Sequence, residues 1–260
     1  MLRFVLPQSG RMEIIINMED MIFGRGPVKE LLKSGHAVDK IIIKSGPYSK
    51  SLIPIIDAAK SRGIVISQAD LAKLDKLANG ENHQGVVALV SAYEYVSVKD
   101  ILDKARQKGE SPFVIICDKI TDPHNLGAVI RTANCVGASG VIIPKRESAG
   151  MNSVVMKTSA GAAEYTPVAK VTNIASAIDE LKKEGLWITA ADMDGQSMYD
   201  IDFKGSIGIV IGSEGNGISR LVKEKCDFIA SIPMRGEINS LNAPTAAAVL
   251  MYEALRQRMN

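Results

Sequence analysis

The chain has 260 residues, and its 31 Lys and Arg side chains nearly balance its 29 Asp and Glu side chains, for a formal net charge of +2. A chain of this length suits two domains of ordinary size, and a charge so near zero neither requires nor excludes nucleic acid as a partner. No apolar run approaches the ~20 residues that cross a bilayer, and the three cysteines lack the paired spacing of a disulfide framework or a zinc site. We therefore expect a cytoplasmic protein without a membrane anchor or a metal.

Residues 1–17 are expected to be an extension, native or added, outside the fold, because Pro7, Gly10 and Glu13 interrupt their short apolar pieces. They also lack the small-residue cleavage site of a signal peptide. From residue 18 to residue 92 helical and strand patterns alternate, which predicts a small αβαβαβ domain. Its expected helices cover 28–33, 51–62 and 70–77, the last capped by Asp70, and its expected strands cover 38–44, 64–66 and 85–92.

Residues 93–112 are more polar, and we expect them to link this domain to a second one at 113–260. The second domain opens with an almost continuous apolar run, which is typical of a strand buried on both faces. Its expected strands cover 113–117, 141–144, 187–191, 207–211 and 228–233, and its expected helices cover 125–136, 153–163, 174–184, 219–225 and 244–259. This alternation predicts an α/β fold with a parallel sheet covered by helices on both faces. Ligands of such sheets bind beyond the carboxyl ends of the strands.

The loop after the first of these strands leads through residues 122–131 (DPHNLGAVIR) into a helix. Asn125 and Arg131 are separated by about 600° of helical rotation, so helical spacing alone does not make them neighbours. One interpretation gives both residues a role in a site. The other makes Asn125 a helix N-cap and Arg131 a solvated helix residue, and composition alone leaves the two equally open.

Two later loops carry further polar residues. Residues 211–217 (IGSEGNG) follow a strand, and their glycines let the backbone approach a ligand closely. Glu214 within this turn is expected to be solvated or paired with a donor, since an unpaired carboxylate is costly to bury. Residues 232–242 (IPMRGEINSLN) precede a helix in which three alanines, 246–248, predict close packing against a neighbour.

These three loops, in this order, resemble the signature motifs of the TrmH class of the SPOUT superfamily. The resemblance runs from residue 18 to the end of the chain and includes residues 82–88 (NHQGVVA). Within the class the chain is most similar to bacterial 23S rRNA guanosine-2'-O-methyltransferases, which modify the P loop of the peptidyl-transferase centre. The resemblance implies a homodimer that uses S-adenosylmethionine. It also implies a deep trefoil knot in the C-terminal domain and a ribosomal L30e-like, RNA-binding fold in the N-terminal domain.

The resemblance further implies which residues form the site. The cofactor is expected to lie largely against backbone groups, with an apolar slot for adenine, at Gly212, Ile232, Pro233, Met234 and Leu241. The positions that match functional residues of the family are Asn125, Arg131, Glu214, Ser240 and Asn242.

A ribose 2'-hydroxyl is a weak nucleophile, so such an enzyme must align it with the sulfonium methyl group and ease the loss of its proton. A guanidinium, with a pKa above about 12, is a poor proton acceptor, and we expect Arg131 to clamp a phosphate or the ribose instead. Glu214 is expected to order Arg131, whereas Ser240 and Asn242 are expected to orient the hydroxyl or the loops. The transfer needs no metal.

The chain departs from its family after the third motif, where relatives usually have a small residue, Ser and then Val, and this chain has Ala243, Pro244 and Thr245. Pro244 removes a hydroxyl and a backbone N–H beside the cofactor loop. We expect the loop to tolerate this change, because proline favours the first turn of a helix.

Three other functions remain in view. The first is methylation of tRNA or of another rRNA site, although the N-terminal domain favours rRNA. The second is a non-catalytic RNA-binding protein, against which the presence of Asn125, Arg131 and Glu214 argues. The third is a nicotinamide-dependent oxidoreductase, which the spacing of the glycines disfavours.

Overall fold

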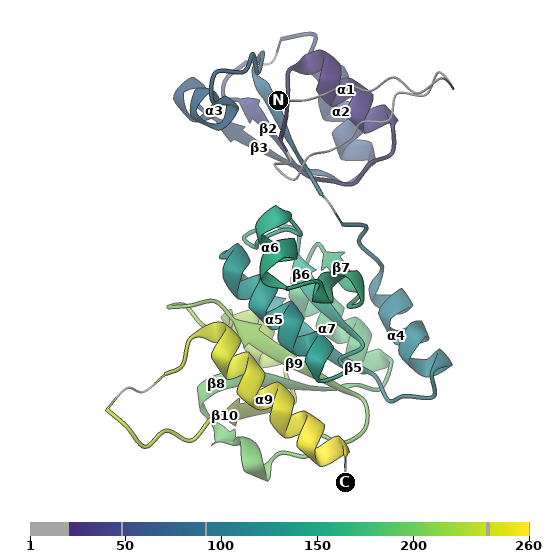
Figure 1. Cartoon of the computed structure of the whole chain (residues 1–260), viewed down its shortest axis with the longest axis vertical. Coiled ribbons are helices and arrows are strands. Elements are labelled where there is room, and N and C mark those ends of the chain that lie inside the picture. The colour runs from purple at the N-terminus through teal and green to yellow at the C-terminus, as the bar shows by residue number, and fades with distance from the viewer. Residues whose placement is uncertain (1–20, 48, 92, 238–239, 260) are drawn as a thin grey trace. The chain divides into compact units, whose positions relative to one another are not determined.

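The computed structural model describes residues 21–47, 49–91, 93–237 and 240–259. The expected extension at 1–17 lies outside these residues, as do Ile238 and Asn239 of the third motif. The chain divides after Glu94 into two compact units, each built around its own β-sheet (Figure 1). Within the described part, no helix is both long and apolar enough to span a membrane.

The first unit contains a mixed sheet in the order β1-β4-β2-β3, with β2 parallel to β3 and β4 antiparallel to β1 and β2. Its elements are β1 (Met21–Phe23), α1 (Arg25–Lys33), β2 (Val38–Lys44), α2 (Ile53–Ser61), β3 (Val65–Ala69), α3 (Leu71–Ala78) and β4 (Val86–Val90). The predicted helices and strands are present, with small shifts at their ends. The short edge strand β1 was not predicted, because three residues are too few to show an alternating pattern.

Alternate residues of β2 serve two cores of the first unit. Ile41 and Ile43 pack with α1 and α2, whereas Ile42 packs with α3, as expected for a strand whose side chains point to opposite faces in turn. The helices therefore cover both faces of this sheet (Figure 1). Asp70 caps α3, as predicted, because its carboxylate accepts a hydrogen bond from the Lys73 N–H at 2.8 Å.

The second unit contains a sheet in the order β10-β8-β9-β5-β6-β7 in which every described pair of neighbours is parallel. This confirms the predicted parallel α/β fold. The elements of this unit are α4 (Val98–Gln107), β5 (Phe113–Asp118), α5 (Pro123–Cys135), β6 (Gly140–Pro144), α6 (Ser153–Thr158), η1 (Ala162–Glu164), β7 (Val168–Val171), α7 (Ile174–Lys183), β8 (Trp187–Ser197), η2 (Met198–Asp200), β9 (Ile207–Gly212), α8 (Arg220–Lys225), β10 (Phe228–Ser231) and α9 (Ala243–Arg258).

Helices cover both faces of this sheet (Figure 1). On one face Val114 and Ile116 of β5 pack in a core that includes residues of α4, α7 and α8. On the other face α5 packs against α9. Ala247 of α9 is fully buried, which agrees with the close packing that the three alanines predicted.

The segment 93–112, expected to be a linker with a short helix, contains α4. A capping box begins this helix, because Ser97 accepts a hydrogen bond from the Asp100 N–H while the Asp100 side chain accepts one from the Ser97 N–H. Ile101 and Leu102 are buried in the core of the second unit. This helix therefore packs as part of that unit.

Two further details differ from the sequence-based expectation. The helix expected at 153–163 ends at Thr158, because Ala160 and Gly161 turn the chain with positive φ angles of 51° and 86°. The strand β7 was not predicted, since its four residues contain Lys170 and show no continuous apolar run.

The close contact between α5 and α6 depends on Gly127. A Cβ atom at this position would lie 2.7 Å from the Thr158 Cβ and 3.0 Å from the Val155 carbonyl oxygen. We expect Gly127→Ala to lower the free energy of unfolding of the second unit by about 1 to 3 kcal/mol, because overpacking forces the two helices apart. Urea unfolding followed by the fluorescence of Trp187, the single tryptophan of the chain, measures this unit directly.

The matched control is Gly26→Ala in α1, where a Cβ meets nothing within 4 Å. It should leave the Trp187 transition unchanged. An unchanged transition for Gly127→Ala as well would show that α5 and α6 do not need this close approach.

Candidate active site

Two of the three predicted loops follow β5 and β9, which run side by side near the middle of the second sheet, and the third follows the edge strand β10. The strands β5 and β9 are parallel neighbours, and their last residues, Asp118 and Gly212, are paired in register. From β5 the chain continues to β6 and β7 on one side, whereas β8 and β10 lie on the other side beyond β9. A crevice for ligands forms at the point of an open parallel sheet where the strand order changes direction in this way.

Asp118 ties the end of β5 to the loop after β9. Its side chain is only 3% exposed, and its Oδ2 accepts a hydrogen bond from the Ser219 N–H at 2.7 Å, across 101 residues of sequence. Since Ser219 precedes α8, this bond fixes where the glycine-rich loop ends. Asp118 was not among the predicted site residues, although a single carboxylate at the end of a wholly apolar strand is a signal that could have found it.

The thiol beside this carboxylate is unsuited to nucleophilic chemistry. Complete burial raises the pKa of Cys117 to about 12, and the charge of Asp118 adds to the effect. Since the thiolate is the reactive form of cysteine, Cys117 serves the core and not the site.

The glycine-rich loop folds back on itself. The Ser213 N–H donates to the Gly217 carbonyl at 3.1 Å, and the Gly217 N–H donates to the Ser213 carbonyl at 3.0 Å. A Cβ atom at Gly212 would lie 2.2 Å from the Gly217 carbonyl carbon. Glycine at 212 is therefore required by the folding of the loop itself, in addition to any contact that its backbone makes with a ligand.

The first two motif loops meet directly. The Asn125 side-chain amide donates a hydrogen bond to the Glu214 Oε1 at 2.7 Å, across 89 residues of sequence. The N-cap interpretation of Asn125 is wrong, because Asp122 caps α5 by accepting a hydrogen bond from the His124 N–H at 2.8 Å. Asn125 lies in the first turn of α5, with its amide directed to the loop after β9.

Arg131 lies further along α5, apart from this pair. It is exposed, and its guanidinium makes no hydrogen bond or ion pair with another described residue. Glu214 was expected to order Arg131, but the structure pairs Glu214 with Asn125 instead. Asn125 and Arg131 both lie on α5, where the helical rotation between them directs them to different sides, as predicted.

The third motif loop connects β10 to α9. Asn242 caps α9 by accepting a hydrogen bond from the Thr245 N–H at 3.2 Å, and Pro244 stands in the first turn of the helix, as predicted. Ser240 is exposed, as is Pro233, and Ile232 is half-buried. The described residues show no hydrogen bond between this loop and Asn125 or Glu214.

Apolar side chains of this loop are left uncovered. Met234 and Leu241 expose 37% and 39% of their surface, although both are large and apolar. An apolar group of a ligand would gain free energy by covering them. The adenine slot that the resemblance implied at this loop stays a prediction.

The loop after β6 is attached to the loop after β5. Lys119 and Glu147, both with positive φ angles of 61° and 54°, form an ion pair at 2.7 Å. The pair raises the pKa of Lys119 and lowers that of Glu147, through their hydrogen bond first and their charges second. The Ala149 N–H also donates to the Ile120 carbonyl at 2.8 Å. The loop after β5 is thus held from both sides.

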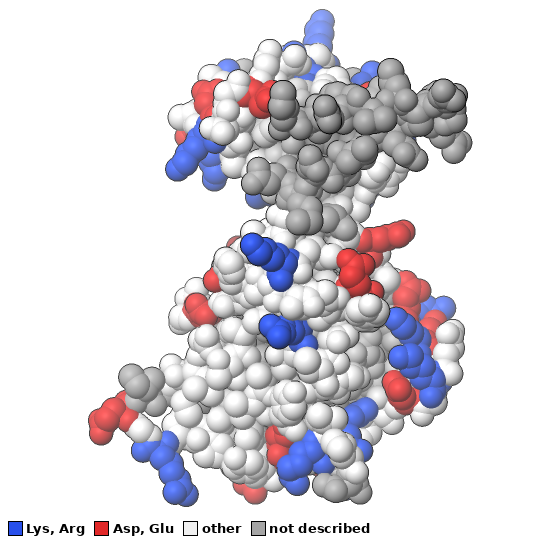
Figure 2. All heavy atoms as spheres, in the orientation of Figure 1, with Lys and Arg blue, Asp and Glu red and all other residues white. Residues whose placement is uncertain are grey.

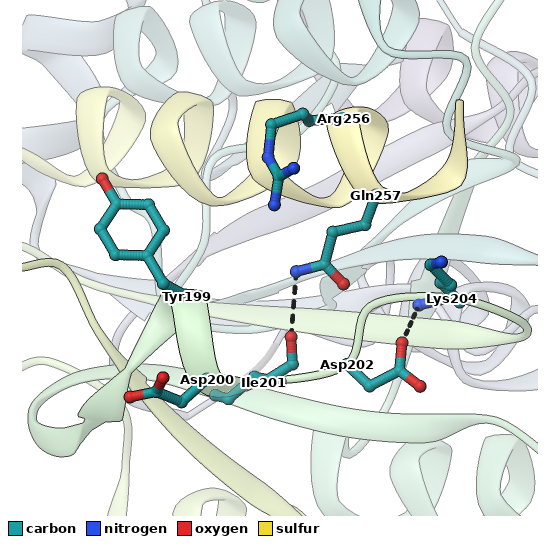
Figure 3. A pocket seen from close by; sticks show the side chains of 7 residues that line it. All are labelled: Tyr199, Asp200, Ile201, Asp202, Lys204, Arg256 and Gln257. Carbon is teal, nitrogen blue, oxygen red and sulfur yellow. Dashed lines mark hydrogen bonds between the residues drawn. The ribbon is translucent and has the colours of Figure 1, made fainter. Parts of the chain in front are cut away.

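A separate pocket of about 460 Å³ lies at the other end of α9 (Figure 3). It contains none of the predicted site residues, and it is lined by Tyr199, Asp200, Ile201, Asp202, Lys204, Arg256 and Gln257. The Gln257 amide donates to the Ile201 carbonyl at 3.0 Å, and Arg256 is paired with Glu253 at 2.7 Å. The Gln257 bond holds the connection between β8 and β9 against α9, whereas the Arg256–Glu253 pair lies within α9. The described residues contain no group of His, Cys, Asp and Glu side chains placed to hold a metal ion.

Each of the two units matches a known protein family. Residues 112–252 match the SpoU rRNA Methylase family, and residues 21–96 match the domain described as RNA 2'-O ribose methyltransferase substrate binding. A Staphylococcus epidermidis protein of the TrmH family, named as a tRNA/rRNA methyltransferase, is 47% identical over 243 residues, which cover 93% of this chain and 97% of that protein. A TrmH-family protein of Bacillus subtilis is 44% identical over 240 residues, covering 92% of this chain and 96% of the relative.

Solved structures show the same fold. The SpoU methyltransferase AviRb from Streptomyces viridochromogenes, crystallised with AdoMet, superposes with a TM-score of 0.58 at 24% identity, covering 92% of this chain and 90% of AviRb. The TrmH/SpoU tRNA modifying enzyme of A. aeolicus has a TM-score of 0.53 at 27% identity, and it covers only 62% of this chain and 84% of its own.

Asp118→Ala should lower the free energy of unfolding by about 1 to 3 kcal/mol, because the partly buried Ser219 N–H loses its acceptor. Asp118→Asn keeps an oxygen that accepts this bond and should lose less. Urea unfolding followed by Trp187 fluorescence compares the two. Equal losses would mean that the charge of Asp118, and not its hydrogen bond to Ser219, is what the fold requires.

Proposed function

This chain belongs to the SpoU rRNA methylase family, and we propose that it transfers the methyl group of S-adenosylmethionine to a ribose 2'-hydroxyl of RNA. RNA methyltransferase activity is the activity of its family. The 2'-hydroxyl is supported by the match of residues 21–96 to the substrate-binding domain of RNA 2'-O ribose methyltransferases. The observation that carries the proposal is the bond between Asn125 and Glu214, which joins two motif loops at the edge of the sheet where a ligand binds.

The proposed cofactor position uses the loops after β9 and β10. The exposed apolar surface of Met234 and Leu241, with Ile232 and Pro233, suits the adenine ring. Gly212 would take part through its backbone, since the loop itself fills the space where its side chain would be. When bound, S-adenosylmethionine supplies a methyl group that its sulfonium already activates, so the protein has to position the acceptor. AdoMet bound to AviRb, which shares this fold, supports the choice of cofactor.

The chain's own residues must orient the 2'-hydroxyl and ease the loss of its proton. Asn125 holds the Glu214 carboxylate in one place through its 2.7 Å bond, which leaves the second oxygen of Glu214 to accept a hydrogen bond from a ribose hydroxyl. Arg131 is exposed, and its guanidinium is a donor only. We therefore assign Arg131 to a phosphate or ribose oxygen. Asn242 acts on the site through the cap that it gives α9, and Ser240 is assigned to orienting the hydroxyl.

The target is proposed to be a guanosine of 23S rRNA, in the P loop of the peptidyl-transferase centre. Two observations support an rRNA target over tRNA. Residues 21–96 match a substrate-binding domain, and the tRNA modifying enzyme of A. aeolicus covers only 62% of this chain. A tRNA or another rRNA site is the second candidate, because the relatives are named as tRNA/rRNA methyltransferases.

A homodimer, the knot and a cytoplasmic location stay predictions.

The reaction is tested by incubating the protein with labelled S-adenosylmethionine and undermodified rRNA, and then mapping the product. We expect label on a ribose 2'-oxygen of one guanosine of 23S rRNA. Undermodified tRNA in parallel separates the two candidate substrates. Label on a base would contradict the proposed reaction, and no label on any RNA would favour the non-catalytic alternative.

Arg131→Ala is expected to abolish methyl transfer and to leave the affinity for S-adenosylmethionine nearly unchanged. The reason is that Arg131 makes no bond within the described structure that the substitution would break, whereas a charge-assisted bond to RNA would be lost. Isothermal titration with the cofactor and a transfer assay measure the two effects. Loss of both together would assign Arg131 a structural role.

A further inference from the structure

The line of contact between α5 and α6 extends from the candidate site along the surface of the second unit. The His124 Nδ1 lies 3.4 Å from the Thr158 Oγ1, and Gly127 approaches Thr158 so closely that no Cβ fits between them. His124, Gly127 and Arg131 are three and four residues apart, so they share one side of α5. Arg131 therefore lies one turn beyond Gly127 on the side of α5 that faces α6, and Lys157 precedes Thr158 on α6.

Arg131 and Lys157 are exposed cations without a counter-charge. Neither side chain makes a hydrogen bond or an ion pair with another described residue. Their own helices provide no counter-charge, because no acidic residue stands three or four positions before or after either of them in the sequence. An acidic residue at either spacing would pair with a lysine or arginine on the helix surface.

Three lysines of α7 and α8, on the opposite face of the same sheet, do have a counter-charge. There Lys182 is paired with Asp227 at 2.6 Å, Lys223 with Asp192 at 2.9 Å and Lys225 with Asp179 at 2.8 Å. On the face of α5 and α6, Figure 2 shows two separate basic groups surrounded by uncharged atoms. Arg131 is the one Lys or Arg of α5, and Lys157 is the one Lys or Arg of α6. Their charges are available to an external anion.

We infer that Lys157 binds a backbone phosphate of the RNA substrate, next to the oxygen bound by Arg131. The inference rests on the proposed function and adds to it a residue outside the three motifs. Arg131 stands about 9 Å along α5 from Asn125, at ~1.5 Å per residue, and Lys157 adjoins Thr158, which contacts α5 one turn before Arg131. The RNA strand is thus held by charge beside the reacting nucleotide. A lysine ammonium is a point charge that binds phosphate without reading sequence.

The test compares Lys157→Gln with the unchanged protein in binding to an undermodified 23S rRNA fragment between about 50 and 200 mM salt. We expect binding weakened about 3- to 10-fold and a plot of log K against log salt that is shallower by about 0.7 to 1, as for the loss of one phosphate contact. Lys157→Arg should restore most of the affinity. The affinity for S-adenosylmethionine should not change, and neither should the unfolding transition that Trp187 fluorescence reports.

The matched control is Lys183→Gln in α7, an exposed lysine on the opposite face of the sheet, which should bind RNA as the unchanged protein does. Normal RNA affinity and salt dependence for Lys157→Gln, in a protein that methylates the rRNA, would overturn this inference and leave the proposed function intact. An equal loss for Lys183→Gln would also overturn it, because the effect would then be general electrostatics. Absence of methyl transfer to any RNA would instead contradict the proposed function.

Discussion

The arrangement of the candidate site depends on one buried carboxylate at the end of β5. Asp118 is almost inaccessible to water, so it needs a hydrogen-bond donor, and the donor is the Ser219 N–H at the far end of the glycine-rich loop. The loop leaves the sheet at Gly212, the register partner of Asp118. Both ends of the glycine-rich loop are therefore held at the end of β5, and Glu214, which lies between them, is placed beside Asn125.

The loop after β5 is held from its other side by the loop after β6. The Lys119–Glu147 ion pair and the bond from the Ala149 N–H to the Ile120 carbonyl do this. An exposed ion pair contributes little stability by itself, but here it joins two residues whose positive φ angles already store strain. Three neighbouring strands thus end in loops that constrain each other, which is what a site needs if it is to position two reactants.

The two faces of the second unit differ in how many of their basic side chains are paired with carboxylates. Lys182 of α7 and Lys223 and Lys225 of α8 are paired with carboxylates, whereas α5 and α6 each carry one basic side chain that is not paired with another described residue. Neutralised charges serve the solubility and packing of the protein. Charges left without a counter-ion beside the site are suited to a polyanion, because binding then releases the ions that screen it.

The sequence by itself determined the alternation of strands and helices, since apolar runs and helical periods are local patterns. It also determined the three motif loops, the capping of α3 by Asp70 and the separation of Asn125 from Arg131 around α5. Only the tertiary structure decided which polar groups meet: the Asn125 amide with the Glu214 carboxylate across 89 residues, and the Asp118 carboxylate with the Ser219 backbone N–H across 101. No period relates positions so far apart, because their contact is set by the order of the strands in the sheet and not by the chain between them.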